Sequence, residues 1–443
     1  MKSWLISSAL LSAVSATEYA VLTVGSNGFG NYRHLADMCR AYHLLLDNGF
    51  DASNVITMAS NDVASWNLTK EQNPFPGQLF TSIGPDGEDW YEGCKFDYEG
   101  ELVNPENYLS VITGDDAAEG LQGGPVLKST KEDRVFLFFV DHGGVGMLCF
   151  PEGKMLYQDE LLAALAVMTE KEMYSELLFY VEACEAGSMF QDSDGKSLIP
   201  EDSKIYVNTA SNATQSSYAV FCPPFSIHDG KLITTCLADL WNTNWYNAVT
   251  KDDGLELSLS AVYEQAKNVT EDFIRGGSNP AEFGDKSFVD ERNGDFLSSG
   301  NNSVRQASKN EEKAVFNNDN DNGGGGMGIV KSEDVLLNNL YYQYLMSDSE
   351  DREREMESLV AELKSRDRSD KIWKELKGII KFDVETFEFD FDCIREVNGK
   401  FRQLVGPYDD YSQIRHSQNV VYMCSAASAQ DIVTALASVA AKY

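Results

Sequence analysis

Residues 135–143 read VFLFFVDHG and residues 177–184 read LLFYVEAC, and these two segments decide the fold. Each begins with a short apolar run rich in aromatic and branched side chains, which predicts a buried β-strand. About forty residues that include a helical pattern separate the two runs, as a crossover between parallel strands requires. The first segment carries His142 near its end and the second ends in Cys184. Because ligands bind beyond the carboxyl ends of parallel strands, the two side chains meet there if the strands are neighbours.

Residues 17–297 repeat this alternation of strands and helices. Further strands are predicted at 19–24, 55–58 and 205–209, and helices at 32–48 and 159–168. Such units indicate an α/β fold with a mainly parallel sheet flanked by helices. In residues 329–443 the apolar positions recur with helical spacing among many charges, as in 335–345, 356–363 and 425–441. That pattern predicts a small all-α C-terminal domain.

Two further segments bound these domains. Residues 1–16 predict a signal peptide, because Lys2 precedes a mostly apolar run that ends in small residues. A buried first helix is the alternative interpretation of that run. Residues 298–328 are rich in asparagine and glycine and have no pattern that builds a core, so they predict a linker.

The chain of 443 residues has a formal net charge of -34 and a sequence pI of about 4.4. So acidic a protein repels phosphate backbones and anionic membrane surfaces, which argues against nucleic-acid binding. Beyond the signal peptide, no stretch approaches the roughly 20 apolar residues of a membrane helix. The low pI fits an acidic lumen, and a secretory route is compatible with four glycosylation sequons, at Asn67, Asn212, Asn268 and Asn301.

Eight cysteines in an export context call for a search for disulfides. Cys222 and Cys236 flank a short loop that contains two prolines, which suits a local disulfide. Cys393 and Cys424 stand alone in the C-terminal part and are candidates to pair with each other. Three more have no obvious partner and are expected to be buried thiols, namely Cys39, Cys94 and Cys149.

A cysteine and a histidine at one sheet edge are the reacting groups of a cysteine peptidase. The thiolate of Cys184 attacks a carbonyl, and His142 takes the thiol proton and later protonates the leaving amine. The backbone N–H groups of Gly143 and Cys184 are candidate oxyanion-hole donors. Taken singly, a cysteine after a strand is more often a structural thiol, and a single histidine is more often a satisfied side chain. No His/Cys/Asp cluster shows metal-ligand spacing, so neither a metal nor another cofactor is expected.

Several longer motifs resemble the legumains, the asparaginyl endopeptidases among the caspase-like cysteine peptidases. The resemblance covers most of residues 18–290, whereas the C-terminal domain resembles the family's only in position and helical character. Six segments carry the resemblance: 25–28 (GSNG), 31–34 (NYRH), 141–143 (DHG), 180–189 (YVEACEAGSM), 216–218 (SSY) and 237–241 (LADLW).

The resemblance implies a role for each matching residue. Cys184 is the expected nucleophile, His142 the base, and Asn31 the residue that orients the imidazole. Asp141 is the family's aspartate beside the catalytic histidine, a candidate to form a succinimide. The residues expected to line the pocket for the side chain before the cut are Arg33, Glu182, Ser216 and Asp239, with His34 close by. From spacing alone, Arg33 has an alternative partner in Asp37, one helical turn further on.

The implied activity is cleavage after asparagine, and after aspartate at low pH, in proteins and peptides. The family carries a C-terminal prodomain, so 329–443 is expected to inhibit the peptidase until the linker 298–328 is cut by the enzyme itself. Legumain prodomains usually hold four cysteines, whereas this one has two. The loop 222–236 resembles that of plant vacuolar processing enzymes. The expected location is a lysosome or vacuole, or the extracellular space.

Three alternatives remain open. A peptide ligase on the same scaffold would pass the acyl group to an amine instead of water. The catalytic subunit of a glycolipid-anchor transamidase has similar motifs but usually a C-terminal membrane helix, whereas 425–443 contains Ser, Gln, Asp and Lys. A catalytically inactive storage or adhesion protein would not need Cys184, His142 and Asn31 together.

Overall fold

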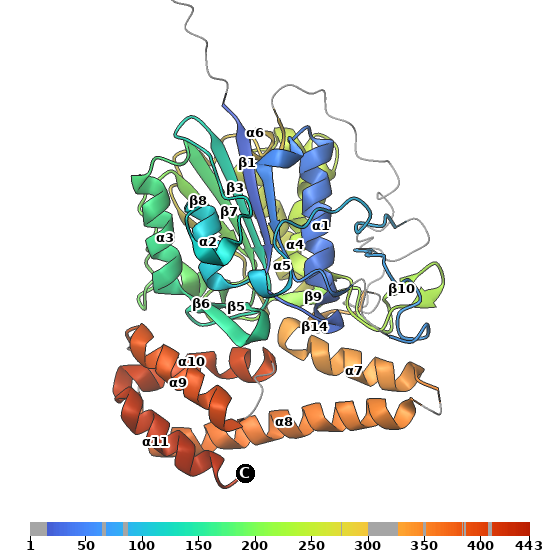
Figure 1. Ribbon diagram of the computed structural model, residues 1–443, viewed down its shortest axis with the longest axis vertical. Coiled ribbons are helices and arrows are strands. Elements are labelled where there is room, and N and C mark those ends of the chain that lie inside the picture. The colour runs from blue at the N-terminus through green and yellow to red at the C-terminus, as the bar shows by residue number, and fades with distance from the viewer. Residues whose placement is uncertain are drawn as a thin grey trace, which may run out of the picture.

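The computed structural model consists of a sheet layered between helices and a group of C-terminal helices below it (Figure 1). The signal-peptide prediction lies outside the described residues, as do most of the linker, Asn67 and Asn301. Asn268 is exposed and Asn212 is half-buried. The structure describes residues 16–63, 68–82, 87–275, 277–299, 327–348, 351–382, 384, 387–405 and 410–443.

The central sheet has six strands, which lie in the order β13-β8-β7-β3-β1-β2. Five strands are parallel and the edge strand β13 is antiparallel to β8, so the expected mainly parallel sheet is confirmed. The sequence did not predict β13, which is four residues long and only half apolar. The bounds are β1 (Glu18–Val24), β2 (Val55–Met58), β3 (Arg134–Val140), β7 (Glu176–Glu182), β8 (Ile205–Thr209) and β13 (Ala281–Gly284).

Successive side chains of the central strands enter two different cores, because the side chains of a strand alternate between its faces. Phe136 and Phe138 pack on the face covered by α1, α4 and α5, whereas Leu137 and Phe139 pack on the face covered by α2 and α3. Both faces are apolar, as the uninterrupted hydrophobic runs predicted. The bounds are α1 (Tyr32–Asp47), α2 (Pro105–Ile112), α3 (Gln158–Glu170), α4 (Leu240–Thr250), α5 (Leu259–Ile274) and α6 (Gly294–Leu297).

Three small sheets extend from the carboxyl edge of the main sheet. One contains β4 (Gly143–Gly144), β5 (Met147–Phe150) and β6 (Lys154–Tyr157). Another joins β12 (Ala238–Asp239), β9 (Tyr218–Val220) and β14 (Val330–Lys331), of which β14 belongs to the C-terminal part of the chain. The third is the hairpin of β10 (Ile227–His228) and β11 (Lys231–Leu232).

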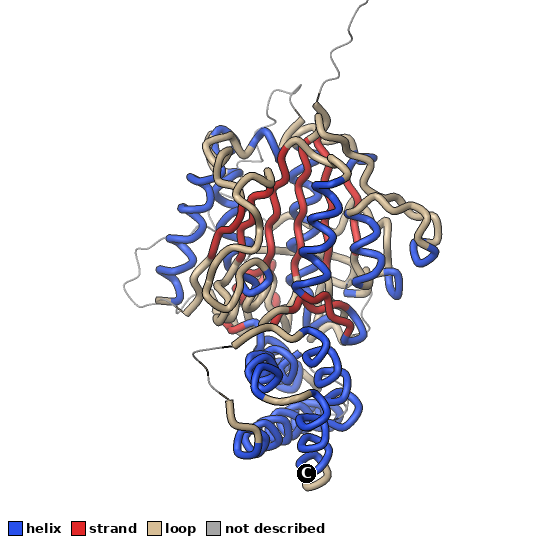
Figure 2. Tube along the Cα trace, turned by 90° about the vertical axis from the view of Figure 1, so that its left-hand side faces the viewer, coloured by secondary structure: helices blue, strands red, loops and turns tan. Residues whose placement is uncertain are grey.

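The C-terminal part is helical, as expected, and lies beneath the carboxyl edge of the sheet (Figure 2). Its core is continuous with the α/β part, since Val145, Met147 and Tyr157 pack in one cluster with Trp373 and Val421. None of the described helices is long and apolar enough to cross a membrane. The bounds are α7 (Val335–Met346), α8 (Arg352–Ile379), α9 (Phe391–Val405), α10 (Asp410–Ala426) and α11 (Ala429–Ala440).

Both proposed disulfides are present, Cys222–Cys236 in a loop and Cys393–Cys424 between α9 and α10. The expectation of buried thiols is wrong for two cysteines. Cys39 on α1 is bonded to Cys94, 55 residues away in sequence, while Cys149 is a free buried thiol. Sequence spacing gave no signal for this pair because a long excursion of the chain returns Cys94 to the helix.

We predict that Gly25→Ala destabilises the protein by about 1–3 kcal/mol, because the close-packed turn after β1 has no room for a methyl group. A Cβ at Gly25 would lie 2.3 Å from the carbonyl oxygen of Cys149 and 2.6 Å from Oδ2 of Asp141. Thermal melting compared with Gly378→Ala on α8, where a Cβ meets no atom within 4 Å, is the measurement. Equal melting temperatures for the two variants would contradict the prediction.

Candidate active site

The pairing of β3 with β7 brings His142 and Cys184 to the same sheet edge. The strands are parallel neighbours with Val140 opposite Glu182, and the Asp141 N–H continues the ladder to the Glu182 carbonyl at 3.0 Å. A Cβ at Gly143 would lie 2.4 Å from the carbonyl oxygen of Cys184. The two loops are therefore in direct contact, and position 143 accepts only glycine.

Asn31 holds the imidazole of His142 in one tautomer. The Oδ1 of Asn31 lies 2.8 Å from Nε2 of His142, and the Asn31 amide nitrogen donates to the Asn27 carbonyl at 2.9 Å. Since the amide oxygen only accepts, Nε2 must carry the hydrogen, which leaves the lone pair of Nδ1 to act as a base. Burial, and then the positive charge of Arg33, hold the pKa of His142 well below its usual range, so the ring is neutral.

Cys184 is fully buried. The Ser217 N–H donates to Sγ at 3.3 Å, and the Ser217 hydroxyl lies 3.6 Å from the same sulfur. Burial, and then the negative charge of Glu185, raise the pKa of the thiol. The thiolate is therefore disfavoured while the sulfur is covered, and reaction needs solvent or substrate at the site together with a base.

Arg33 is paired with Asp239 inside the protein. Its Nε donates to Oδ1 of Asp239 at 2.8 Å, and the Asp239 N–H in turn donates to Oδ2 of Asp37 at 3.1 Å. The alternative Arg33–Asp37 pair is not formed, since Asp37 lies 3.7 Å from Arg40 instead. Glu182 accepts from the Asn242 N–H at 2.9 Å.

Three buried carboxylates therefore lie close to the guanidiniums of Arg33 and Arg40 at this site. Burial raises the pKa of Glu182, with repulsion from Asp239 and Asp37 adding to the effect. The pKa of Asp37 is raised by burial and by Asp239, and that of Asp239 by burial against the opposing effect of Arg33. These carboxylates bind protons at a higher pH than exposed ones do, so the pocket becomes less negative as the pH falls.

His34 connects the pocket with the catalytic loop. Its Nδ1 lies 2.7 Å from the Ser26 hydroxyl and 3.4 Å from Asp141, and its Nε2 lies 3.6 Å from Asp239. The ring also packs edge-on against His142, with centroids 5.0 Å apart. Ser216, the remaining predicted residue, is buried directly before Ser217.

The sequence missed three residues of this site. Asp37 supports the backbone of Asp239, Ser217 contacts the nucleophile, and Ser26 contacts His34. Asp37 was considered only as a partner of Arg33, because helical spacing predicts contacts along one helix and not contacts across the fold.

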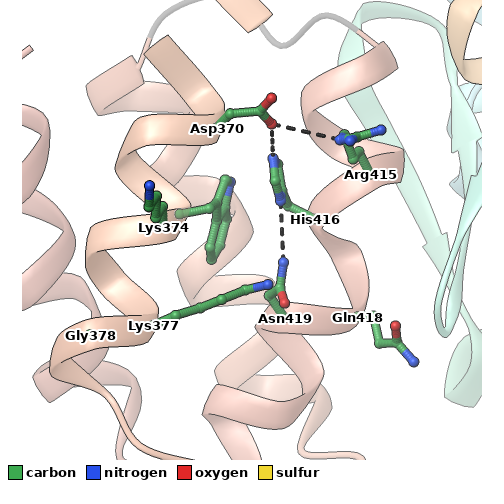
Figure 3. A pocket seen from close by; sticks show the side chains of 9 residues that line it. Asp370, Lys374, Lys377, Gly378, Arg415, His416, Gln418 and Asn419 are labelled. Atoms are coloured by element: carbon green, nitrogen blue, oxygen red, sulfur yellow. Dashed lines mark hydrogen bonds and ion pairs between the residues drawn. The ribbon is translucent and has the colours of Figure 1, made fainter. Parts of the chain in front are cut away.

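A separate hollow between α8 and α10 contains none of these residues (Figure 3). Within it, Nε2 of His416 lies 2.8 Å from Asp370, and the Asn419 amide donates to Nδ1 of His416 at 3.2 Å. Burial lowers the pKa of His416 to about 4. Within the hollow, His416 is bonded to Asp370 and Asn419. We assign the hollow no role.

A buried thiol and an imidazole held in its base tautomer by an amide, both at one sheet edge, are the groups that a cysteine peptidase needs. Residues 18–299 match the Peptidase C13 family. The chain is 34% identical over 395 residues to the Hemoglobinase of Schistosoma mansoni, covering 87% of this chain and 82% of that protein. It is 37% identical over 278 residues to the Vacuolar-processing enzyme of Glycine max, covering 62% of this chain and 54% of that protein.

The chain belongs to the peptidase C13 family, which confirms the resemblance found in the sequence, and it is a cysteine endopeptidase. A solved structure of caspase-1 from Spodoptera frugiperda aligns with a TM-score of 0.33 and 10% identity, over 62% of this chain and 93% of that one. A likeness at that level supports no inference about the site.

We predict that Asn31→Ala lowers kcat/KM by about 10- to 100-fold, because His142 loses the acceptor that fixes its tautomer. Asn27→Ala is the matched control, since that side chain donates to Glu152 at the surface and not to His142. Peptide hydrolysis by the two processed variants is the measurement. An Asn31→Ala enzyme as active as Asn27→Ala would show that the 2.8 Å contact does not support catalysis.

Proposed function

We propose that the protein is an asparaginyl endopeptidase made as a zymogen. The observation that carries the proposal is the buried Arg33–Asp239 pair beside Glu182, next to the catalytic loops. An asparagine side chain offers one carbonyl acceptor and two N–H donors. Arg33 donates to the carbonyl, Glu182 and Asp239 accept from the amide nitrogen, and Ser216 and His34 complete the pocket.

Catalysis follows from the tautomer of His142. Its Nδ1 takes the thiol proton as the Cys184 sulfur attacks the carbonyl carbon, and the N–H groups of Gly143 and Cys184 bind the oxyanion. The protonated imidazole then gives that proton to the leaving amine, which leaves an acyl-enzyme. Water, deprotonated by His142, releases the acid and restores the thiol. Asp141 is the residue proposed to form a succinimide, a side reaction that hydrolysis does not require.

We predict that Asn is preferred over Ala before the scissile bond by at least about 100-fold, because the pocket's polar groups are left unpaired by Ala. An Asp substrate meets the pocket carboxylates and is repelled until they bind protons. Since their pKa values are raised, cleavage after Asp increases as the pH falls, while cleavage after Asn continues over a broad acidic range.

Three fluorogenic peptides that differ only in Asn, Asp or Ala before the cut, assayed between pH 4 and pH 7, measure both effects. Cys184→Ala is the control and should be inactive on all three. Asp cleaved as fast as Asn at pH 6 would refute the pocket assignment.

We further propose that the segment 327–443 inhibits the peptidase. Strand β14 pairs antiparallel with β9, with Val330 opposite Ala219 and Lys331 opposite Tyr218. The pairing continues to the Ser332 N–H, which donates to the Ser217 carbonyl at 3.1 Å. Because Ser217 also contacts the Cys184 sulfur, this strand ends at a neighbour of the proposed nucleophile. A substrate strand added to β9 competes for the same backbone groups.

Helices α7 and α10 extend the region that the C-terminal segment covers toward the residues around His142. On α7, Asn339 donates to the Gly30 carbonyl at 3.3 Å and to Thr235 at 2.9 Å. On α10, the Ser417 hydroxyl accepts from the Val145 N–H at 3.0 Å. The shared apolar core with Val145 and Met147 then holds the helices in place. The cover is removed when the chain is cut in the asparagine-rich stretch within 298–328 and the segments separate.

We predict that the purified full chain has low peptidase activity and gains it after incubation near pH 4.5. Mass spectrometry of the fragments should place the cuts after asparagines of 298–328, since these are the enzyme's own preferred residues. Cys184→Ala should remain intact alone and be cut when mixed with active enzyme. Full activity of the intact chain, or cuts in Cys184→Ala incubated alone, would contradict this proposal.

The relatives named for vacuolar processing, the acidic composition and the sequons support a vacuole or lysosome reached through the secretory pathway. The three disulfides agree with that route, because disulfides persist in oxidising compartments.

A further inference from the structure

Three potential metal ligands lie together at the sheet edge that also carries Cys184. His34, Asp141 and His142 each offer one nitrogen or oxygen atom, and these three atoms lie within 4.8 Å of one another. All three side chains are buried. The ligands come from α1 and from the loop after β3, so no local spacing in the sequence reveals the group.

We propose that a divalent transition-metal ion, with Zn²⁺ as the best match, binds His34, Asp141 and His142 and thereby inhibits the peptidase reversibly. Imidazole nitrogen and carboxylate oxygen are common ligands of Zn²⁺, at about 2.0–2.2 Å. Two ligands of a tetrahedral ion are then about 3.3–3.5 Å apart. Nδ1 of His34 and Oδ1 of Asp141 already have a separation of 3.4 Å.

The hydrogen-bond partners of both rings favour Nδ1 as the ligand atom. Nε2 of His142 faces the Asn31 oxygen at 2.8 Å, and Nε2 of His34 faces Asp239 at 3.6 Å. A ligating histidine usually gives its other N–H to a carboxylate or carbonyl oxygen, which fixes the tautomer and orients the ring. Here the Nε2 atom of each imidazole faces an oxygen acceptor of that kind, and neither acceptor belongs to the three-residue cluster.

Binding has a local cost and a direct consequence. The ion must displace the Ser26 hydroxyl, which lies 2.7 Å from Nδ1 of His34. A metal on Nδ1 of His142 removes the lone pair that takes the thiol proton, so hydrolysis stops while the ion is bound. With three protein ligands, the fourth position is left for water or for the Cys184 thiolate. This inference does not depend on preference for asparagine or on the inhibitory role of 327–443.

The test is zinc binding by the full-length Cys184→Ala protein, which has no nucleophilic thiol to bind the ion. Equilibrium dialysis against Zn²⁺, followed by metal analysis, should give about one more Zn²⁺ per chain than in the same protein carrying His34→Gln or Asp141→Asn. His43→Gln is the matched control, because His43 lies on the same helix and contacts the Trp90 carbonyl instead. Thermal melting of each variant establishes that it is folded.

Two outcomes would overturn the proposal. One is equal zinc content in folded His34→Gln, Asp141→Asn and His43→Gln proteins. The other is a spectrum of the Co²⁺-loaded Cys184→Ala protein identical to that of Co²⁺ in buffer, since the cluster predicts strong ligand-field absorption. The inhibitory part is tested on the processed wild-type enzyme, where Zn²⁺ should abolish hydrolysis, EDTA should restore it and Mg²⁺ should have no effect. Full activity at saturating Zn²⁺ would refute inhibition.

Discussion

Seven consecutive residues of β3 pair in parallel register with seven of β7, and the active site depends on this pairing. Adjacent strands are about 4.8 Å apart, so the residues that directly follow their carboxyl ends lie close to one another. The register sets Val140 opposite Glu182 and therefore places the histidine loop against the cysteine loop. A slip by one residue would exchange the side chains that enter the two apolar cores, so the close packing of each core fixes the register.

Helix α1 adds a second constraint, because it lies against the same edge and carries Asn31 at its start, with Arg33 and His34 in its first turn. Burying Arg33 with several carboxylates is costly unless the charges are paired and hydrogen-bonded. The Arg33–Asp239 pair and the backbone N–H groups that donate to Asp37 and Glu182 offset this cost. The raised pKa of Glu182 also lowers its negative charge, because the carboxylate binds a proton more readily. A buried charged group of this kind is less favourable for stability than apolar side chains would be, and the role we propose for it is selectivity for a polar side chain.

The C-terminal helices complete the structure and pack against the loop that follows His142. Val145 and Met147, which follow the catalytic histidine in sequence, belong to the same apolar cluster as Trp373. Strand β14 pairs with β9 directly after Ser217, which contacts Cys184, and Ser417 accepts from the Val145 N–H in the loop after His142. The inhibition proposed above therefore rests on the docking of a whole group of helices and not on one side chain.

The sequence by itself determined the main strands, the parallel arrangement, the helical C-terminal part and the placement of His142 and Cys184 at one sheet edge. These follow from hydrophobic runs, periodicity and strand ends, which are local properties of the chain. Only the tertiary structure decided that Arg33 pairs with Asp239 and not with Asp37, that Cys39 bonds to Cys94, and that β14 pairs with β9. Each of these contacts joins segments far apart in sequence, and their geometry is set by how the helices and loops pack on the sheet.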